Sequence, residues 1–198
     1  FSGQLSAVSN AAARGEFTLV LLPDTQRYAR NNPAMFFSQT HWIRDHQDAL
    51  NIRFVIHLGD IVDDNTDREW RVADEAMGVL DARVPYTVVP GNHDYENHPT
   101  RTGRIKYAPK YNAVFPPLRF RDKLWYGGHK GTTNDNNYCF FTAAGRDFLI
   151  IGLEFGPSDE ALEWAGQLAR AHPDKHVIVA THCYMYDDDT RLGPGDDY

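Results

Sequence analysis

The sequence contains few cysteines and no hydrophobic run long enough to cross a membrane. Only Cys139 and Cys183 occur among its 198 residues, too few for a disulfide framework or a cysteine-rich zinc site. The longest apolar run lies around Phe17–Leu22, well short of the roughly 20 residues that a membrane-spanning helix needs. We therefore expect a soluble domain without a membrane span. Two cysteines do not decide between a reducing and an oxidising compartment.

Basic residues are also in short supply. The chain has 20 Lys+Arg against 27 Asp+Glu, which gives a formal net charge of −7. A protein that coats nucleic acid needs a basic face, so a nucleic-acid partner is disfavoured, although bound metal ions could still attract a phosphate backbone. With 42% hydrophobic and 24% charged residues, the chain has the composition of one folded globular domain. It gives no indication of an oligomeric state.

The order of strand and helix patterns predicts a layered α/β domain. Unbroken apolar runs are typical of strands buried on both faces, and the apolar spacing between them is that of helices. Thr66 followed by Glu69 matches a capping box, and Ser158 suits the start of another helix. The segment 95–137 lacks periodicity and is expected to be a long functional loop. We expect strands at 17–22, 54–58, 84–89, 138–142, 148–153 and 176–181, and helices at 33–50, from 66, and from 158 to about 172.

Side chains that can bind metals follow four of the predicted strands. In open α/β sheets, ligands bind beyond the carboxyl ends of the strands, so these side chains are expected to meet at one edge. Carboxylates, amide oxygens and imidazole nitrogens together suit Zn, Mn, Fe or a similar divalent ion. Each residue alone has an ordinary structural explanation, such as a turn that begins at an aspartate, but their shared position favours a metal centre. The residues are Asp24 and Gln26, Asp60, Asn92 with His93 and Asp94, and His182.

These motifs resemble those of the calcineurin-like metallophosphoesterases. The matching motifs are Asp24-x-Gln26, Gly59-Asp60-x-x-Asp63, Gly91-Asn92-His93-Asp94 and His182, and the resemblance extends from about Phe17 to Arg191. It implies an α/β fold, a two-sheet mixed β-sandwich flanked by helices. It also implies a centre of two divalent metal ions that hydrolyses phosphoric esters with metal-activated water.

The resemblance also implies a role for each motif residue. The metal ligands would be Asp24 for the first ion, Asp60 as the bridge between the ions, and Asn92 with His182 for the second. A bridging ligand serves two cations at once, which suits a carboxylate better than a neutral amide. His93 would contact the substrate phosphate or protonate the leaving oxygen, and Asp94 would orient His93.

The sequence departs from the family pattern in two places. The family usually has a histidine where Gln26 stands, and an amide oxygen is a weaker, uncharged ligand, so Gln26 binds either the metal or only its water. The closing Gly-His-x-His block is also absent. The one Gly-His pair, Gly128-His129, precedes His182 and is interpreted as loop. We expect the missing block beyond Tyr198, with residues 1–16 as a lead-in and residues 17–198 as a catalytic domain incomplete at its C-terminus.

Two residues beyond His182 are candidates for binding the substrate. Tyr184 could stack on an organic group and Arg191 could contact a phosphate oxygen. The alternative for this segment is a solvated acidic turn.

The predicted function is metal-dependent hydrolysis of a phosphomonoester or phosphodiester substrate. The alternative is a non-catalytic binding module with a degenerate metal site, which Gln26 and the missing block favour. The presence of His93 and Asp94 disfavours that alternative, because a scaffold has little need of a general acid. The first residue, Phe1, is consistent with an exported protein whose signal has been removed.

Overall fold

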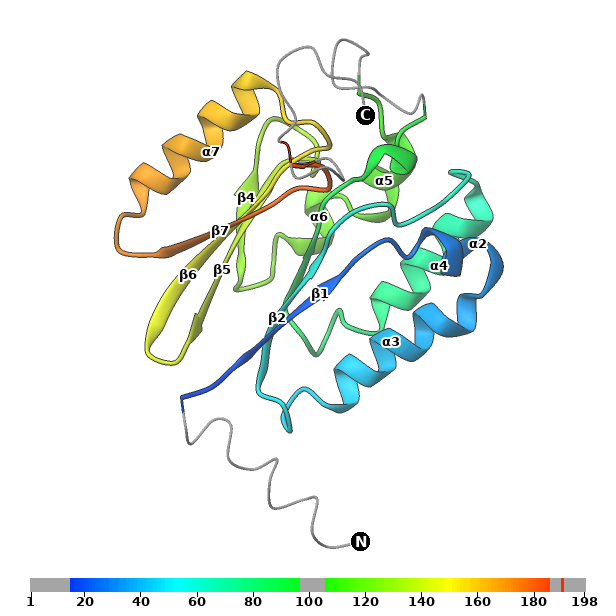
Figure 1. Cartoon of the computed structure of the whole chain (residues 1–198), viewed down its shortest axis with the longest axis horizontal. Coiled ribbons are helices and arrows are strands. Elements are labelled where there is room, and N and C mark those ends of the chain that lie inside the picture. Colours follow the sequence, from blue (N-terminus) through cyan, green and yellow to red (C-terminus); the bar gives the residue numbers. More distant parts are fainter. Residues whose placement is uncertain (1–14, 97–105, 186–189, 191–198) are drawn as a thin grey trace, which may run out of the picture.

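Two β-sheets packed face to face form the frame of the molecule (Figure 1). The computed structural model describes residues 15–96, 106–185 and 190. The first sheet is parallel, whereas the second is antiparallel until its last strand, which runs parallel to its neighbour. The predicted two-sheet mixed fold is confirmed. In spatial order the first sheet contains β1 (Thr18–Leu22), β2 (Ile52–His57) and β3 (Tyr86–Val88), and the second contains β4 (Tyr126–His129), β5 (Asn137–Ala143), β6 (Arg146–Gly152) and β7 (His176–Ala180).

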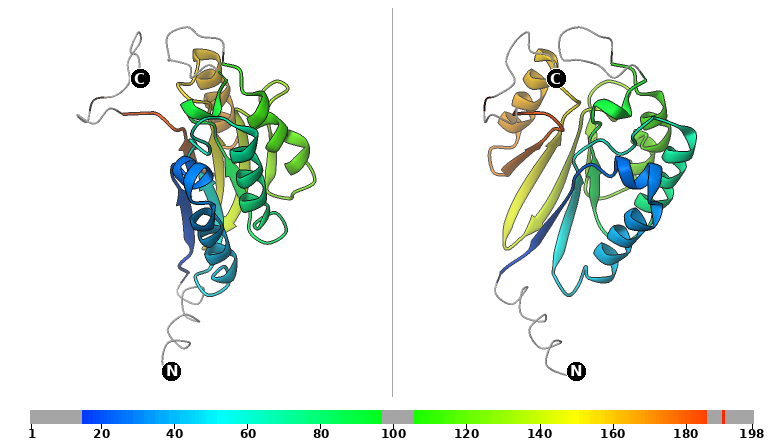
Figure 2. Two further views of the ribbon diagram at one scale, coloured as in Figure 1. Left: turned by 90° about the vertical axis from the view of Figure 1, so that its right-hand side faces the viewer. Right: turned by 45° about the vertical axis from the view of Figure 1, so that its right-hand side comes forward.

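Helices cover the outer faces of the two sheets (Figure 2). Three of them lie against the first sheet and a long one lies against the second. None of the helices in the described part of the chain is both long and apolar enough to cross a membrane. On the first sheet are α2 (Gln26–Asn31), α3 (Pro33–Asp45) and α4 (Asp67–Gly78), on the second is α7 (Asp159–Ala171), and the shorter α5 (Pro109–Val114) and α6 (Pro117–Phe120) lie between β3 and β4 in the chain.

The core between the sheets is built from alternating side chains of facing strands. Phe54 and Ile56 of β2 are buried and pack with Cys139 and Phe141 of β5. Because successive side chains of a strand point to opposite faces, the intervening Val55 faces the helices instead. Burial on both faces explains why this strand reads as a continuous apolar run. The core thus fixes the two sheets against each other.

Helix α4 begins at the predicted capping box. The side chain of Thr66 accepts a hydrogen bond from the N–H of Glu69, and the Glu69 carboxylate accepts one from the N–H of Thr66. The same carboxylate accepts hydrogen bonds from the backbone N–H groups of Asp63 and Asp64. The start of the helix is therefore tied to the loop that follows Asp60.

The prediction of a long loop at 95–137 is wrong for the described part of that segment, which contains α5, α6 and β4. Both helices begin with a proline, which suits a first helical position. They are held by buried Tyr111, Phe115 and Phe120, and they are too short to show a helical period in the sequence. Gly128 and His129, interpreted as loop, lie in β4 and pair with β5. Helix α2 was not expected, and the helix predicted at 33–50 ends at Asp45.

Candidate metal centre

A cavity of about 400 Å³ opens at the carboxyl ends of the strands. It lies where β1, β2 and β7 end and where the loop after β3 begins. All the residues predicted to bind metal line it, and so does His93. The walls are formed by Pro23, Asp24, Gln26, Leu58, Asp60, Asn92, His93, Thr181 and His182. The fold therefore brings these residues together from four separate parts of the chain.

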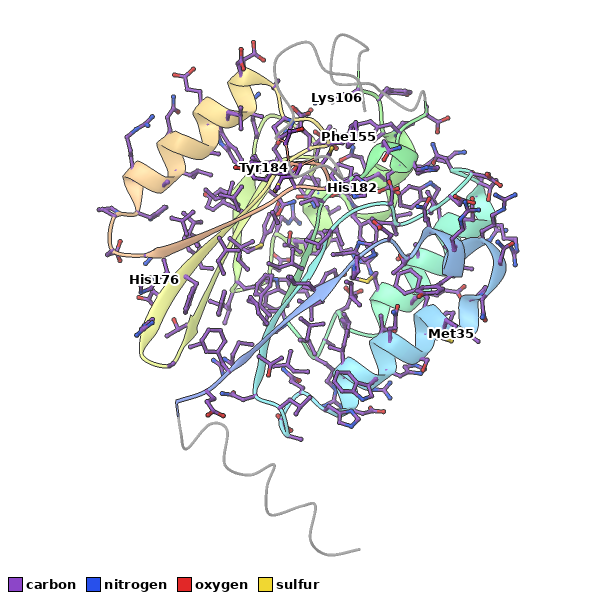
Figure 3. All side chains as sticks on the ribbon, in the orientation of Figure 1. Met35, Lys106, Phe155, His176, His182 and Tyr184 are labelled. Atoms are coloured by element: carbon purple, nitrogen blue, oxygen red, sulfur yellow. The ribbon has the colours of Figure 1, made fainter. Side chains whose placement is uncertain are left out.

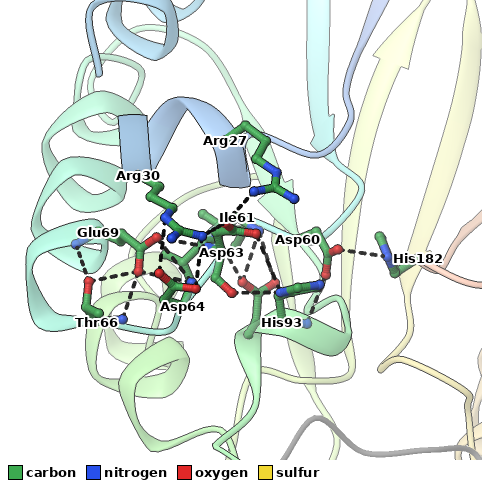
Figure 4. A network of polar contacts seen from close by, with 12 residues as sticks. Arg27, Arg30, Asp60, Ile61, Asp63, Asp64, Thr66, Glu69, His93 and His182 are labelled. Carbon is green, nitrogen blue, oxygen red and sulfur yellow. Dashed lines mark hydrogen bonds and ion pairs between the residues drawn. The ribbon is translucent and has the colours of Figure 1, made fainter. Parts of the chain in front are cut away.

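Asp24, Asp60 and His182 form a cluster with the geometry of a metal site. Each offers one ligand atom, and the three atoms lie within 4.8 Å of one another. Nε2 of His182 lies 3.5 Å from Oδ2 of Asp60 (Figure 4). Nδ1 of His182 lies 3.7 Å from Oδ1 of Asp24. The side chains of Asp60 and His182 are almost completely buried, whereas that of Asp24 is 56% exposed. A cation could therefore enter from the side of Asp24.

Two glycines allow the loops after β2 and β3 to approach each other closely. Gly59 has φ +99°, and a Cβ atom there would lie 2.7 Å from the backbone nitrogen of Gly91. Such a contact is too short for any side chain, and positive φ is costly for residues other than glycine. The two loops can therefore meet only as backbone against backbone.

The backbone is strained at both aspartates of the cluster. Asp24 has φ 32° and Asp60 has φ 48°. Left-handed conformations of residues other than glycine cost on the order of 1–3 kcal/mol and persist only where the surrounding structure enforces them. Here the N–H of Gln26 donates a hydrogen bond of 2.9 Å to the backbone oxygen of Asp60, which joins the two strained loops.

The Asp60 carboxylate occupies a position that disfavours its charge. Burial raises the pKa of Asp60, and the neighbouring carboxylate of Asp24 raises it further. Two groups act in the opposite direction: His182, and the backbone N–H of His93, which donates to Oδ1 of Asp60 at 3.0 Å. A divalent cation between Asp24 and Asp60 would offset the cost of holding both carboxylates charged.

Two amide oxygens of the cavity wall have no hydrogen-bond partner. Oε1 of Gln26 and Oδ1 of Asn92 are buried and unpaired among the residues that the structure describes. Buried polar atoms are almost always satisfied, so these two atoms suggest a partner that binds in the cavity. Hard oxygen atoms are suitable ligands for divalent cations. The residues present therefore fit a metal centre, including Gln26 at the position where the family usually has histidine.

The orientation of His182 suits a metal ligand. Its Nδ1 lies 3.0 Å from the backbone oxygen of Leu58, and a carbonyl can only accept, so Nδ1 carries the proton. The other ring nitrogen, Nε2, faces Asp60. Metal-binding histidines usually donate their other ring N–H in this way, which fixes both the tautomer and the ring. Figure 3 shows His182 near the middle of the molecule, where the strands end.

His93 is oriented by Asp63. Nδ1 of His93 lies 2.7 Å from the backbone oxygen of Asp63 and 3.8 Å from the Oδ1 atom of its carboxylate. The buried carboxylate of Asp63 is in turn paired with Arg30 at 2.6 Å and Arg27 at 3.0 Å (Figure 4). Neither arginine was among the residues expected at the site. Their spacing of three residues directly after Gln26 was the available signal, because such residues share one face of a helix.

Asp94 lies behind the cavity rather than in its wall. It is fully buried, and its carboxylate accepts hydrogen bonds from the backbone N–H groups of Ile61, Val62 and Gly91. It therefore braces the loops after β2 and β3, while the contact with the His93 ring that we expected from Asp94 is made by Asp63. Burial raises the pKa of Asp94, and the nearby carboxylate of Asp60 raises it further.

Of the two predicted substrate residues, only Tyr184 is described by the structure. Tyr184 is 55% exposed and lines a neighbouring apolar cavity with Leu21 and Val179. Arg191 lies outside the described residues.

Comparison with known proteins defines the class to which this fold and site belong. The sequence matches the calcineurin-like phosphoesterases over residues 17–197. The chain belongs to that family, as its motifs suggested.

Two curated relatives are similar to parts of the chain. It is 39% identical over 175 residues to the uncharacterized protein YvnB of Bacillus subtilis (strain 168), and this alignment covers 87% of the chain but 13% of YvnB. It is 29% identical over 136 residues to a protein of Arcobacter nitrofigilis named as the probable glycerophosphodiester phosphodiesterase GpdQ, covering 65% of the chain and 40% of that protein. The chain thus spans less than half the length of either relative.

Proposed function

We propose that this protein hydrolyses phosphoric esters with a pair of divalent metal ions held at the strand ends. The observation that carries this proposal is the convergence on one cavity of the Asp24, Asp60 and His182 cluster with the unpaired amide oxygens of Gln26 and Asn92. Membership of the calcineurin-like phosphoesterase family supports the class of reaction.

The residues divide naturally between two cations. Asp24 and Gln26 lie on the β1 side of the cavity and would hold one ion, while Asn92 and His182 would hold the other. Asp60 lies close to both Asp24 and His182 and would be shared, since a carboxylate has two oxygens to offer. Manganese, zinc and iron all suit this mixed set of oxygen and nitrogen ligands. Such ions are Lewis acids, and they would therefore neutralise phosphate charge and lower the pKa of water.

His93 is placed to give a proton to the departing ester oxygen. The residue lines the cavity, and its Nδ1 lies 2.7 Å from the backbone oxygen of Asp63. In the imidazolium form, Nε2–H would donate to the leaving oxygen as a general acid.

Among phosphoric esters, we favour a diester as the substrate. The support is the relative named as a probable glycerophosphodiester phosphodiesterase, which matches 65% of the chain. Monoester hydrolysis is the alternative, and both are tested by the same assay.

Replacement of Asp60 provides the direct test. The Asp60→Asn variant loses the shared charge but keeps the size of the side chain. It should reduce hydrolysis of bis(p-nitrophenyl) phosphate and p-nitrophenyl phosphate to background in the presence of Mn²⁺. The matched control is Asp122→Asn, whose side chain is 88% exposed and which should retain full activity. Undiminished turnover in Asp60→Asn would contradict the proposal.

The same assay separates catalysis from simple binding. A wild-type protein that binds Mn²⁺ but hydrolyses neither ester would favour the binding module. That alternative is suggested by Gln26, which stands where the family usually has histidine. A wild-type protein that binds no divalent metal and hydrolyses neither ester would contradict the proposed hydrolysis and favour the non-catalytic module with a degenerate metal site.

A further inference from the structure

A buried histidine outside the cavity connects the two loops that carry Asp24 and Asp60. His57 is the last residue of β2 and is fully buried. Its ring packs near the ring of Phe36 in α3, with the centroids 6.1 Å apart. It is not among the residues that line the metal cavity. Its hydrogen-bonding partners are Thr25 and the backbone of Gly59.

The direction of each hydrogen bond around His57 follows from the chemistry of the groups. The backbone N–H of Gly59 can only donate and lies 3.2 Å from Nδ1, so Nδ1 carries no proton. Nε2 of the neutral ring therefore carries the proton and donates to Oγ1 of Thr25 at 2.9 Å. The Thr25 hydroxyl donates in turn to the backbone oxygen of Ile61 at 3.2 Å. A single chain of hydrogen bonds thus runs from Gly59 through His57 and Thr25 to Ile61, and each residue donates to the next. Burial lowers the pKa of His57 to about 3, in keeping with a neutral ring.

The residues of this hydrogen-bond chain are neighbours in sequence of the candidate metal ligands. Thr25 stands between Asp24 and Gln26, while Gly59 and Ile61 stand on either side of Asp60. Thr25 and Ile61 are also fully buried, so water cannot replace the hydrogen bonds between them. A strained conformation persists only where its surroundings enforce it. The hydrogen-bond chain fixes the two loops in which Asp24 and Asp60 have positive φ.

We propose that His57 and Thr25 are positioning residues that set the distance between Asp24 and Asp60 and thereby the affinity of the centre for its metal. The inference rests on the proposed function, because it assigns these residues a role toward the metal held by the two carboxylates. Neither residue touches the cavity, so both act through the loops that they connect. Hydrogen-bonding partners of metal-binding groups typically alter metal affinity by about 10–100-fold when they are replaced.

The test is the affinity for Mn²⁺, measured by titration calorimetry on the metal-free protein. Thr25→Val keeps the shape of the side chain and removes its hydroxyl, and we expect Mn²⁺ to bind at least about tenfold more weakly. Thr25→Ser restores the hydroxyl and should restore most of the affinity. The thermal unfolding midpoint of each metal-free variant is measured alongside.

A second buried threonine provides the control. Thr40 is also fully buried, and its hydroxyl donates to backbone oxygens of Phe36 and Phe37 within α3, away from the cavity. Thr40→Val should lower the unfolding midpoint without changing the affinity for Mn²⁺. A general loss of stability would lower the affinity for Mn²⁺ in Thr25→Val and Thr40→Val alike. A positioning role lowers this affinity only in Thr25→Val.

The possible outcomes are distinct. Wild-type affinity for Mn²⁺ in Thr25→Val would overturn the positioning role while leaving the proposed function intact. If Thr25→Val does not fold, His57→Asn gives the same test, because its amide can accept from Gly59 but is too short to reach Thr25. Weaker binding in that variant supports the inference, and unchanged binding overturns it. A wild-type protein that does not bind Mn²⁺ would overturn the proposed function, and the positioning role with it.

Discussion

The backbone of Gly91 lies against the carboxylate of Asp60 with no room for a side chain between them. A Cβ atom at Gly91 would lie 2.2 Å from Oδ1 and 2.3 Å from the backbone nitrogen of Asp60. Gly91 has φ −95°, which any residue adopts easily. Position 91 is therefore restricted to glycine by lack of space alone, because the Asp60 carboxylate occupies the place that a side chain would need.

Gly91→Ala should consequently disable the centre. The added methyl group must displace Asp60, so we expect the affinity for Mn²⁺ to fall by more than about tenfold and the free energy of unfolding to fall by about 1–3 kcal/mol. Calorimetric titration and denaturant unfolding measure the two effects. Gly78→Ala is the control, since its nearest neighbour would be 3.8 Å away. Normal Mn²⁺ binding by Gly91→Ala would show that the loops have more freedom than the structure indicates.

His93→Gln should lower the rate without removing the metal. Loss of a general acid costs about 10²–10⁴-fold in rate, and the loss should be larger for esters with poor leaving groups than for p-nitrophenyl esters, which need little protonation. The measurement is kcat for a series of aryl and alkyl phosphoesters, with Mn²⁺ affinity as the control. An equal loss of kcat for good and poor leaving groups would argue against proton donation by His93.

The free energy of unfolding should fall with rising pH because of Asp135. Burial, together with the nearby Glu154 carboxylate, raises the pKa of this carboxyl from 3.8 to about 6, against the hydrogen bond from Asn112. Since the native state binds the proton more tightly than the unfolded state, the stabilisation is complete below pH 3.8 and is lost as the pH rises through about 6. The loss is on the order of 2–3 kcal/mol.

Asp135→Asn should make this fall smaller by about 2–3 kcal/mol, because its amide oxygen can still accept from Asn112 and has no charge to bury. Urea unfolding of the metal-free protein between pH 4 and about 7 measures the effect. The exposed Asp122→Asn variant should retain the wild-type fall. A fall of the same size in Asp135→Asn would assign the pH dependence to another group.

Asp60→Asn should have opposite effects on stability with and without metal. Burial disfavours the charged form of Asp60, so the neutral side chain should make the metal-free protein at least as stable as the wild type. Mn²⁺ at 100 times its Kd should stabilise the wild type by about 2.7 kcal/mol and the variant by much less. Thermal unfolding with and without a chelator measures both quantities. Equal stabilisation of the two proteins by Mn²⁺ would mean that the ion binds elsewhere.

The position of the site could be predicted from the sequence because it depends on local rules. Asp24, Asp60 and Asn92 each follow a strand of the parallel sheet, and parallel strands present their carboxyl ends at one edge. A glycine directly before Asp60 and another before Asn92 are local signals for a close approach of backbone. These features need no knowledge of distant contacts.

The surroundings of the site could not be predicted, because they depend on pairs of residues far apart in the chain. Arg30 and Asp63 are 33 residues apart, and nothing near either residue indicates the other. The adjacent Asp94 was the natural partner for His93 in the sequence, yet its side chain turns to the backbone of Ile61 and Val62. Helices α5 and α6 were missed because they are too short to show a helical period. Buried aromatic side chains hold them in place.

The most direct test of the account is an anomalous difference map from crystals grown with Mn²⁺ and measured at the manganese absorption edge. We predict two peaks in the cavity, one beside Asp24 and Gln26 and one beside Asn92 and His182, with the Asp60 carboxylate in contact with both. A map with no peak within bonding distance of Asp60 would contradict the claim that these strand ends form a metal centre.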